Sequence, residues 1–160
     1  MIDPRQFRDV LGNFATGVTV ITANDNGEVV GLAANSFISV SLDPPLIGFA
    51  AARTSMTYPR IRSAGTFCVN VLAEGQEEVA RVFGRRDIDR FQEVSWHESP
   101  YAHAPVLEGA LAWIDCRLYG EQDAGDHVFV LGEVLDLAFD TEIPSPLLFF
   151  RGRYALVTPE

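Results

Sequence analysis

Gly31 to Pro45, with the sequence GLAANSFISVSLDPP, is small and polar inside a region that otherwise has the apolar pattern of buried strands. Buried polar groups require hydrogen-bond partners, so this composition predicts a surface shaped for a flat, polar ligand. Two prolines end the stretch and stiffen its exit, and the backbone groups near Ser39–Ser41 suit the alternating edge of a planar heterocycle. The residues expected to form this surface are Ala33, Ala34, Asn35, Ser36, Ser39 and Ser41. The alternative is that they only fill a tight barrel wall.

A second polar cluster, Arg53-Thr54-Ser55, follows shortly and precedes a helix expected near Thr57–Ala64. One guanidinium, two hydroxyls and the first amides of that helix match the needs of a phosphate. The alternative is a simple helix cap beside a solvated arginine. Because the polar strand lies just upstream, the two segments together indicate a phosphorylated ring cofactor.

Length and composition predict one domain spanning residues 1–160, since 160 residues with 48% hydrophobic content can bury a full core. The net charge is −10 and the chain contains no lysine, which argues against a nucleic-acid surface. Cys68 and Cys116 lie in β-like runs and are expected to be reduced, buried thiols. The start of the chain does not resemble a signal peptide, and no apolar run reaches the ~18 residues that span a bilayer. We therefore expect a cytoplasmic protein with no membrane contact.

The first half of the chain combines helix and strand signals. Asp3-Pro4 predicts a capped first helix, and a two-residue period from Gly17 predicts a strand. On that strand Val18, Val20 and Thr22 are expected to face opposite to Thr19 and Ile21. Asp25-Asn26-Gly27 has hairpin turn chemistry and leads into a return strand over Val29–Val40. Further expected elements are strands at Leu46–Ala50 and Thr66–Leu72, a helix over Glu74–Phe83 that Gly84–Asp87 breaks, and a short helix or loop at Asp89–Phe91.

The second half is predicted to be almost entirely β. Strands are expected over Leu111–Tyr119, Asp126–Leu137, Leu147–Phe150 and Tyr154–Val157, with a loop at Gly120–Gly125. The run Val128–Leu131 is typical of a strand covered on both faces. About seven strands with few helices between them predict a mainly β, antiparallel barrel with a few peripheral helices.

The sequence lacks the common motifs for metal binding, phosphate-binding loops and nucleophilic catalysis. No CxxC, HExxH, GxGxxG, GxxxxGK or GxSxG pattern occurs, and the three histidines are scattered, so a metal site is not expected. His127, at the mouth of the barrel, could meet a second substrate or simply bond Asp126. A cofactor-shaped surface without acid–base machinery favours hydride transfer, in which the cofactors supply the chemistry.

Seven segments in order resemble the flavin reductase-like family with an FMN-binding split barrel, and most closely the small reductase components of two-component flavin monooxygenases. They are FATGVTVIT (Phe14–Thr22), GLAANSFISVSLDPPL (Gly31–Leu46), RTS (Arg53–Ser55), FCVNVL (Phe67–Leu72), DRF (Asp89–Phe91), GDH (Gly125–His127) and PLLFFRGRY (Pro146–Tyr154). The resemblance implies a Greek-key split barrel and a homodimer that binds FMN or FAD near the subunit interface. It also implies NADH or NADPH as hydride donor and a separate monooxygenase as recipient of reduced flavin.

The resemblance also implies roles for individual residues. Ala34, Asn35, Ser36 and the backbone of Ser39, Val40 and Ser41 would line the flavin ring and ribityl chain, while Ser36, Arg53, Thr54 and Ser55 would serve its phosphate, with Thr16 and Gly17 nearby. His127 matches the position that faces the nicotinamide and is the candidate catalytic residue, with Phe83 and Arg153 as its neighbours. Ala33 departs from the threonine that similar proteins often have, which is expected to weaken flavin retention or shift the preference between FMN and FAD.

These inferences lead to an NAD(P)H:flavin oxidoreductase as the expected function. Two alternatives stay open from the sequence alone. One is a non-catalytic flavin-binding protein, and the other is a flavoprotein that keeps its flavin and reduces another small acceptor.

Overall fold

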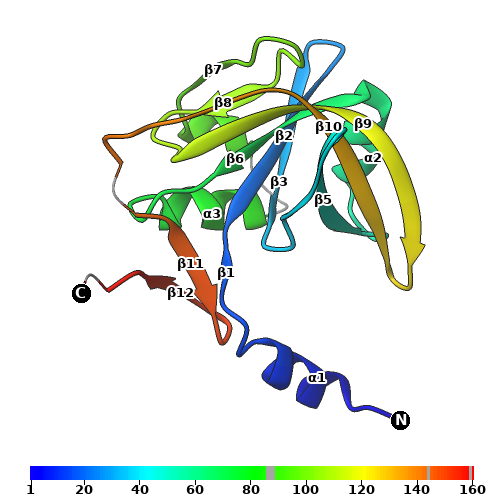
Figure 1. Cartoon of the computed structure of the whole chain (residues 1–160), viewed down its shortest axis with the longest axis vertical. Coiled ribbons are helices and arrows are strands. Elements are labelled where there is room, and N and C mark those ends of the chain that lie inside the picture. Colours follow the sequence, from blue (N-terminus) through cyan, green and yellow to red (C-terminus); the bar gives the residue numbers. More distant parts are fainter. Residues whose placement is uncertain (86–88, 144, 159) are drawn as a thin grey trace.

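A computed structural model shows a mainly β chain with helices at its periphery (Figure 1), and it describes residues 1–85, 89–143, 145–158 and 160. The helices in these ranges are α1 (Pro4–Leu11), α2 (Tyr58–Ala64), α3 (Glu77–Gly84) and the short 3-10 helix η1 (Arg90–Glu93). The strands are β1 (Thr16–Gly17), β2 (Thr19–Asp25), β3 (Glu28–Ala34), β4 (Ile38–Leu42), β5 (Pro45–Ala52), β6 (Thr66–Val71), β7 (Trp96–Glu98), β8 (Pro105–Leu107), β9 (Ala112–Ala124), β10 (His127–Phe139), β11 (Leu147–Phe150) and β12 (Arg153–Leu156). In the same ranges no helix is long and apolar enough to cross a membrane.

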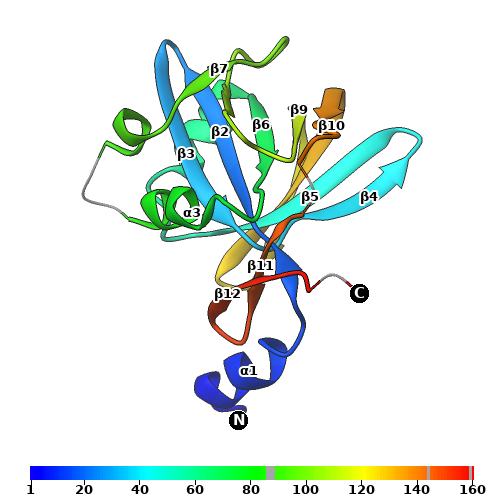
Figure 2. The ribbon, with the colours of Figure 1, turned by 90° about the vertical axis from the view of Figure 1, so that its left-hand side faces the viewer.

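The main sheet has seven strands in the order β3-β2-β6-β9-β10-β5-β4, and every strand pair in it is antiparallel. Its two end strands, β3 and β4, are joined by only residues 35–37, so the sheet must curl until its ends approach each other. The hairpin of β4 and β5 projects from this curled sheet (Figure 2). Two small sheets, β1-β11-β12 and β7-β8, complete the fold. The predicted mainly β, antiparallel architecture is confirmed.

Local sequence signals explain several element boundaries. The Asp3 carboxylate accepts a hydrogen bond from the amide of Arg5 (3.0 Å) at the start of α1, as the Asp-Pro signal predicted. Asn26 and Gly27 have positive φ angles of 54° and 92° in the turn between β2 and β3, which is the geometry that Asn-Gly hairpins favour. At α2, Pro59 lies in the first turn, where its missing donor costs nothing.

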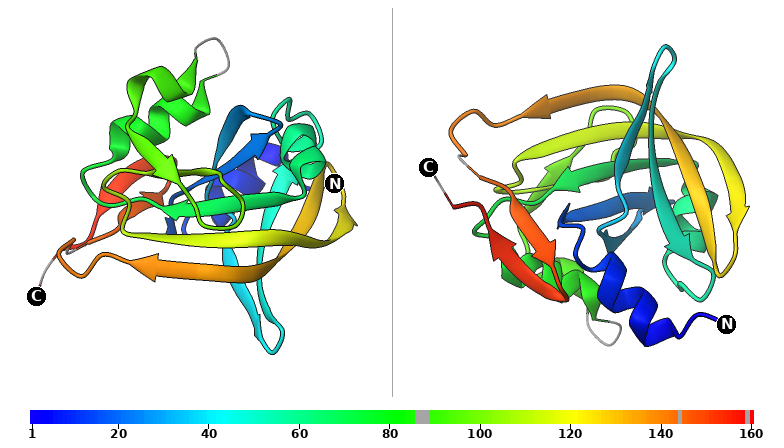
Figure 3. Two further views of the ribbon diagram at one scale, coloured as in Figure 1. Left: turned by 90° about the horizontal axis from the view of Figure 1, so that it is seen from above. Right: turned by 60° about the horizontal axis from the view of Figure 1, so that its bottom comes forward.

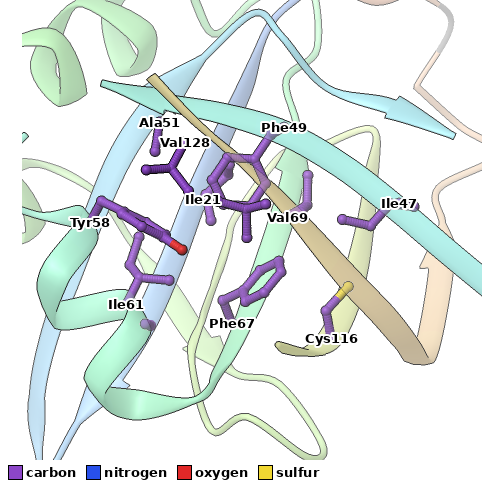
Figure 4. Packing of buried hydrophobic residues seen from close by; sticks show 12 residues of the cluster. Ile21, Ile47, Phe49, Ala51, Tyr58, Ile61, Phe67, Val69, Cys116 and Val128 are labelled. Carbon is purple, nitrogen blue, oxygen red and sulfur yellow. The ribbon is translucent and has the colours of Figure 1, made fainter. Parts of the chain in front are cut away.

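The core lies on both faces of β2. Ile21 packs inside the barrel with Phe49 and Phe67, whose rings meet edge to face (Figure 4). Val18 and Val20 pack on the opposite face, in the cluster that includes Leu72, Phe83 and Leu147. The predicted alternation along β2 is therefore confirmed for these residues. Cys68 and Cys116 are buried free thiols, as expected, and burial raises the pKa of both.

Several predicted boundaries are wrong. The single return strand over Val29–Val40 is split, because Phe37 turns into the core and β4 pairs with β5 instead of continuing β3. The predicted loop Gly120–Gly125 is mostly strand, since β9 pairs with β10 up to Ala124. The run Val128–Leu131 is not covered on both faces in the chain: Val128 and Val130 are buried while the alternate residues are half-buried.

Two further differences concern the middle of the chain. The helix expected from Glu74 begins at Glu77, because Ala73 and Gln76 form a tight turn in which the Gln76 side chain accepts from the Ala73 amide. The helix includes Gly84, one residue beyond the predicted end at Phe83, and Arg86 and Asp87 of the expected break lie outside the described residues. The strands β7 and β8 were not predicted.

Gly132 provides a stability test of the barrel interior. A Cβ atom there would lie 2.6 Å from Cζ of Phe67 and 3.2 Å from Cδ1 of Ile47, so Gly132→Ala is expected to lower the free energy of unfolding by about 2 kcal/mol through overpacking. Urea denaturation measures the change. Gly120→Ala is the matched control on the adjacent strand, since no described atom lies within 4 Å of its Cβ position. Equal stability of the two variants would contradict the prediction.

Candidate functional site

The C-terminal end of β5 brings together three of the segments singled out in the sequence. The Ser36 hydroxyl accepts from the Ala50 amide (2.9 Å) and donates to the Ala50 carbonyl (3.2 Å). Two residues further along β5, Ala52 lies opposite His127 on β10, and the Arg53 amide then donates to the Asp126 carbonyl (3.0 Å). Ser36 of the polar stretch, the Arg53–Ser55 cluster and His127 therefore surround one strand end.

The start of β2 adjoins the same region. Thr19 pairs with Ala34, and its hydroxyl donates to the Ala34 carbonyl (2.7 Å). This bond fixes the backbone just before Asn35, where the chain leaves β3.

On the other side of β5, β4 is an end strand of the main sheet, so one row of its backbone amides and carbonyls faces away from β5. A register shift between Ser39 and Ser41 marks a β-bulge at Val40, which leaves the backbone of that residue out of the ladder. Ser39 lies opposite Ile47, and Ile47 and Arg53 are about 20 Å apart along the strand. The site thus offers backbone hydrogen-bonding groups of β4 at one end and the Arg53 guanidinium at the other. This separation suits an elongated ligand with a polar ring at one end and an anionic group at the other.

Arg53 is engaged at the tip of the β9–β10 hairpin. Its Nη2 lies 2.5 Å from Oδ1 of Asp123, and its Nε donates to the Gly125 carbonyl (2.9 Å). The guanidinium is therefore held, but both side chains of the ion pair are exposed, at 44% and 90%. Thr54 is exposed beside it.

Ser55 has a structural role at the start of α2. Its Oγ accepts from the amides of Thr57 (3.2 Å) and Tyr58 (3.1 Å). The N-cap residue of α2 is Thr57 rather than Ser55, and the amides of Thr57 and Tyr58 are already bonded by the Ser55 hydroxyl. The proton of that hydroxyl is still available to an acceptor, and the predicted contribution of Arg53 and Thr54 to an anion site stays a prediction.

His127 bonds its neighbour. Its Nδ1 lies 2.7 Å from Oδ1 of Asp126, and this hydrogen bond, followed by the charge of the imidazolium, holds the pKa of that carboxyl below its usual value. The Asp126 carboxylate orients the ring through Nδ1, and the side chain is half-exposed. The second ring nitrogen, Nε2, is therefore not used by this hydrogen bond. The two readings of His127, turn residue and substrate donor, are compatible in this arrangement.

A cleft of about 860 Å³ opens beside the strand end, between β3, the residues 55–57 that precede α2, the end of α3 and η1. Ala33, Ser55 and Phe83 of the predicted residues line it, as does Ala52. Phe83 is buried and meets Phe91 edge to face at 5.1 Å. A Cβ at Gly31 would lie 2.8 Å from the Phe83 ring, so a glycine there permits this close approach.

Three predicted residues lie away from this strand end in the chain. Thr16 and Gly17 form β1 and pair with β11, and Arg153 is exposed on β12 of the same small sheet. The Thr16 hydroxyl is buried and has no hydrogen-bond partner among the described residues.

The residues present fit a phosphorylated flavin. The bulged edge strand offers backbone donors and acceptors to a heterocycle, and the Arg53 guanidinium offers charge to a phosphate. Among the described residues, no group of three or more His, Cys, Asp and Glu side chains is placed to hold a metal ion.

Sequence reasoning missed several residues of this region. Phe91 and Arg90 line the cleft, and Arg90 bonds the Gly31 carbonyl, which ties η1 to β3. The DRF segment was noted without a role, so its aromatic and basic residues were the available signal. Asp123 was placed in a loop, and nothing local to its sequence indicated a contact with Arg53, seventy residues away.

Comparison with known proteins agrees with this geometry. The flavin reductase like domain family matches residues 11–158. The chain is 48% identical over 159 residues to the flavin-dependent monooxygenase reductase subunit HsaB of Rhodococcus jostii, covering 99% of this chain and 80% of that protein. It is 47% identical to a flavin reductase of Pseudomonas putida, covering 96% of this chain and 89% of that protein.

Solved structures give the same result. Nitrilotriacetate monooxygenase component B of Mycobacterium thermoresistibile matches with a TM-score of 0.94 and 44% identity, covering 97% of this chain and 87% of that one. The NADH:FAD oxidoreductase SgcE6 of Streptomyces globisporus, in complex with NAD and FAD fragments, matches with a TM-score of 0.93 and 37% identity, covering 100% and 98%. These neighbours are flavin reductases with a split barrel, which confirms that part of the fold prediction.

Proposed function

The chain belongs to the flavin reductase like domain family, and from that membership and the geometry at the end of β5 we propose that it is an NAD(P)H:flavin oxidoreductase. It would act as a single flavin reductase-like domain and release reduced FMN or FAD to a separate monooxygenase. The observation that supports this proposal most is the convergence of Ser36, Arg53 and His127 on one strand end. The relatives named as reductase subunits of flavin-dependent monooxygenases support the same division of labour.

A bound flavin supplies the capacity to accept a hydride from nicotinamide. The chain's own groups bind and orient. The backbone of Ser39, Val40 and Ser41 would bond the polar edge of the ring, and its amide dipoles would stabilise negative charge there. Arg53 and Thr54, with the Ser55 hydroxyl, would hold the phosphate, and Ser36 fixes the connecting backbone.

The nicotinamide would approach from the side of His127 and the adjoining cleft. Phe83 forms part of the wall of that cleft, and Ala33 leaves space where a larger residue would narrow it. Holding two rings face to face supplies much of the rate through orientation alone. Asp126 would keep the His127 ring in the required orientation.

Steady-state oxidation of NADH and NADPH with added FMN or FAD tests this function. The expected result is turnover that requires flavin, followed by passage of reduced flavin through an ultrafiltration membrane. Stoichiometric flavin that neither nucleotide reduces would favour the binding-protein alternative. Reduced flavin that stays with the protein would favour a flavoprotein with another acceptor.

We also propose that the chain forms a homodimer. The α1 side chains Phe7, Val10 and Leu11 are each more than half exposed, and α1 lies outside the sheets beside β11 and β12 (Figure 3). On β4, Leu42 is 97% exposed. Exposed apolar side chains on these two elements favour coverage by a second copy.

Light scattering after size exclusion tests the oligomeric state. The expected mass is twice the 17.6 kDa of one chain. Phe7→Asp with Val10→Asp is expected to give monomers and to weaken flavin turnover, if the second copy completes the site. A wild-type mass of one chain at micromolar concentration would contradict the proposal.

A further inference from the structure

We propose that Asp123 competes with the phosphate of a bound flavin for the Arg53 guanidinium, and thereby limits how tightly the protein holds a phosphorylated flavin. The inference rests on the proposed function, since it concerns the anion end of the same site. It assigns a role to Asp123 on β9, a residue that the proposed reductase chemistry does not otherwise use.

The contact itself is direct. Oδ1 of Asp123 lies 2.5 Å from Nη2 of Arg53, and the Gly125 carbonyl accepts from Nε at 2.9 Å. These bonds use two of the five N–H donors of the guanidinium, so others remain free to bind an anion. Because the carboxylate is 90% exposed, it can leave Arg53 without a desolvation cost when a stronger anion arrives.

The hairpin tip does not depend on this ion pair for its position. Glu121, on the same strand, accepts two hydrogen bonds from Arg62 (2.7 and 2.8 Å) and one from the Tyr58 hydroxyl (2.6 Å). The Arg62 guanidinium holds the pKa of the Glu121 carboxyl below its usual value, so this anchor stays charged. Pairing of β10 with β5 fixes the other side of the tip. Asp123 can therefore change its contacts while the hairpin remains in place.

Electrostatics then gives the direction of the effect. A phosphate that binds Arg53 must displace the Asp123 carboxylate or accept its negative charge nearby, and either outcome weakens phosphate binding. The ribityl chain and ring feel this charge much less, because they are uncharged. Asp123 is thus expected to lower affinity for FMN and FAD selectively, which suits a protein that must release its reduced flavin.

The test compares FMN with riboflavin, which lacks the phosphate, on wild type and Asp123→Asn. Asparagine keeps the shape and an acceptor oxygen but removes the charge. The expected result is a Kd for FMN about threefold lower in the variant, with the Kd for riboflavin unchanged. At about 1 M NaCl, where the screening length is about 3 Å, the gain should largely vanish. Glu133→Gln is the matched control, because it breaks an ion pair with Arg117 (2.6 Å) on the same two strands and removes the same charge.

The outcomes separate this inference from the proposed function. Wild type that binds neither flavin overturns the proposed function, and this inference with it. A second outcome overturns the inference alone. In it, wild type binds FMN, and the ratio of the Kd for FMN to the Kd for riboflavin is the same in Asp123→Asn as in Glu133→Gln. Weaker FMN binding in Asp123→Asn also overturns it, because Asp123 would then position Arg53 for the phosphate.

Discussion

Replacing Asp115 with alanine is expected to lower the free energy of unfolding by about 3 kcal/mol, a large share of the total for a domain of this size. Asp115 is completely buried on β9. Its carboxylate accepts from the Ser99 hydroxyl (2.9 Å) and from the amides of Tyr101 (2.7 Å) and Ala102 (3.2 Å). The variant leaves these donors without their acceptor, the Ser99 hydroxyl and the Ala102 amide in buried residues, and it removes the carboxylate that holds residues 99–102 against β9.

Urea denaturation followed by tryptophan fluorescence measures this loss. Asp140→Ala is the control, because Asp140 is exposed and accepts a single amide, that of Glu142 (2.8 Å). The free energy of unfolding of Asp115→Asn is expected to fall between those of the two alanine variants. Its side-chain amide keeps one acceptor oxygen, but its NH2 group replaces the second oxygen and faces other donors. A midpoint for Asp115→Ala within error of the control would contradict the assigned role of the carboxylate.

The elements that sequence predicts well are those fixed by neighbouring residues. The Asp3-Pro4 cap, the Asn26-Gly27 turn and the alternation along β2 depend on local backbone geometry or on a two-residue period, which the sequence displays directly. The resemblance to a known family supplied the barrel topology, which local patterns alone do not specify.

The features that sequence missed depend on contacts between distant segments. The chain leaves β3 after Ala34 because Ser36 bonds β5 and Phe37 enters the core, and neither event has a local signature. Asp123 looked like a loop residue in an acidic, glycine-containing run, yet its strand is held by pairing with β10. The β7–β8 hairpin depends on buried partners such as Asp115, which lies further along the chain.

The candidate site was predictable in part for the same reason. Residue types suited to a ring and a phosphate could be recognised, and the structure brings Ser36, Arg53 and His127 to one strand end. Which hydrogen bonds those residues already make could not be read from sequence. Arg53 is held by Asp123, and the Ser55 hydroxyl accepts from the amides of Thr57 and Tyr58 at the start of α2.

His127→Ala is expected to lower the rate constant for flavin reduction by NADH roughly tenfold to a hundredfold, with the Kd for FMN unchanged within about twofold. His127 pairs with Ala52, and Ala52 itself lines the cleft. The proposed phosphate ligands, Arg53 to Ser55, follow Ala52 along the chain. Loss of the ring therefore removes a donor that would orient the nicotinamide and leaves the flavin contacts in place.

Stopped-flow absorbance with flavin-saturated protein separates the reduction step from nicotinamide and flavin binding. His97→Ala is the matched control, because His97 is also exposed and also pairs with a carboxylate, Glu108 at 3.1 Å, but lies on β7 away from the cleft. His127→Asn is expected to recover part of the rate, since its amide can still donate near the position of the ring. Identical reduction rates in His127→Ala and His97→Ala would contradict a contact between His127 and nicotinamide. His127 would then have only a structural role, in its hydrogen bond with Asp126 at the hairpin turn.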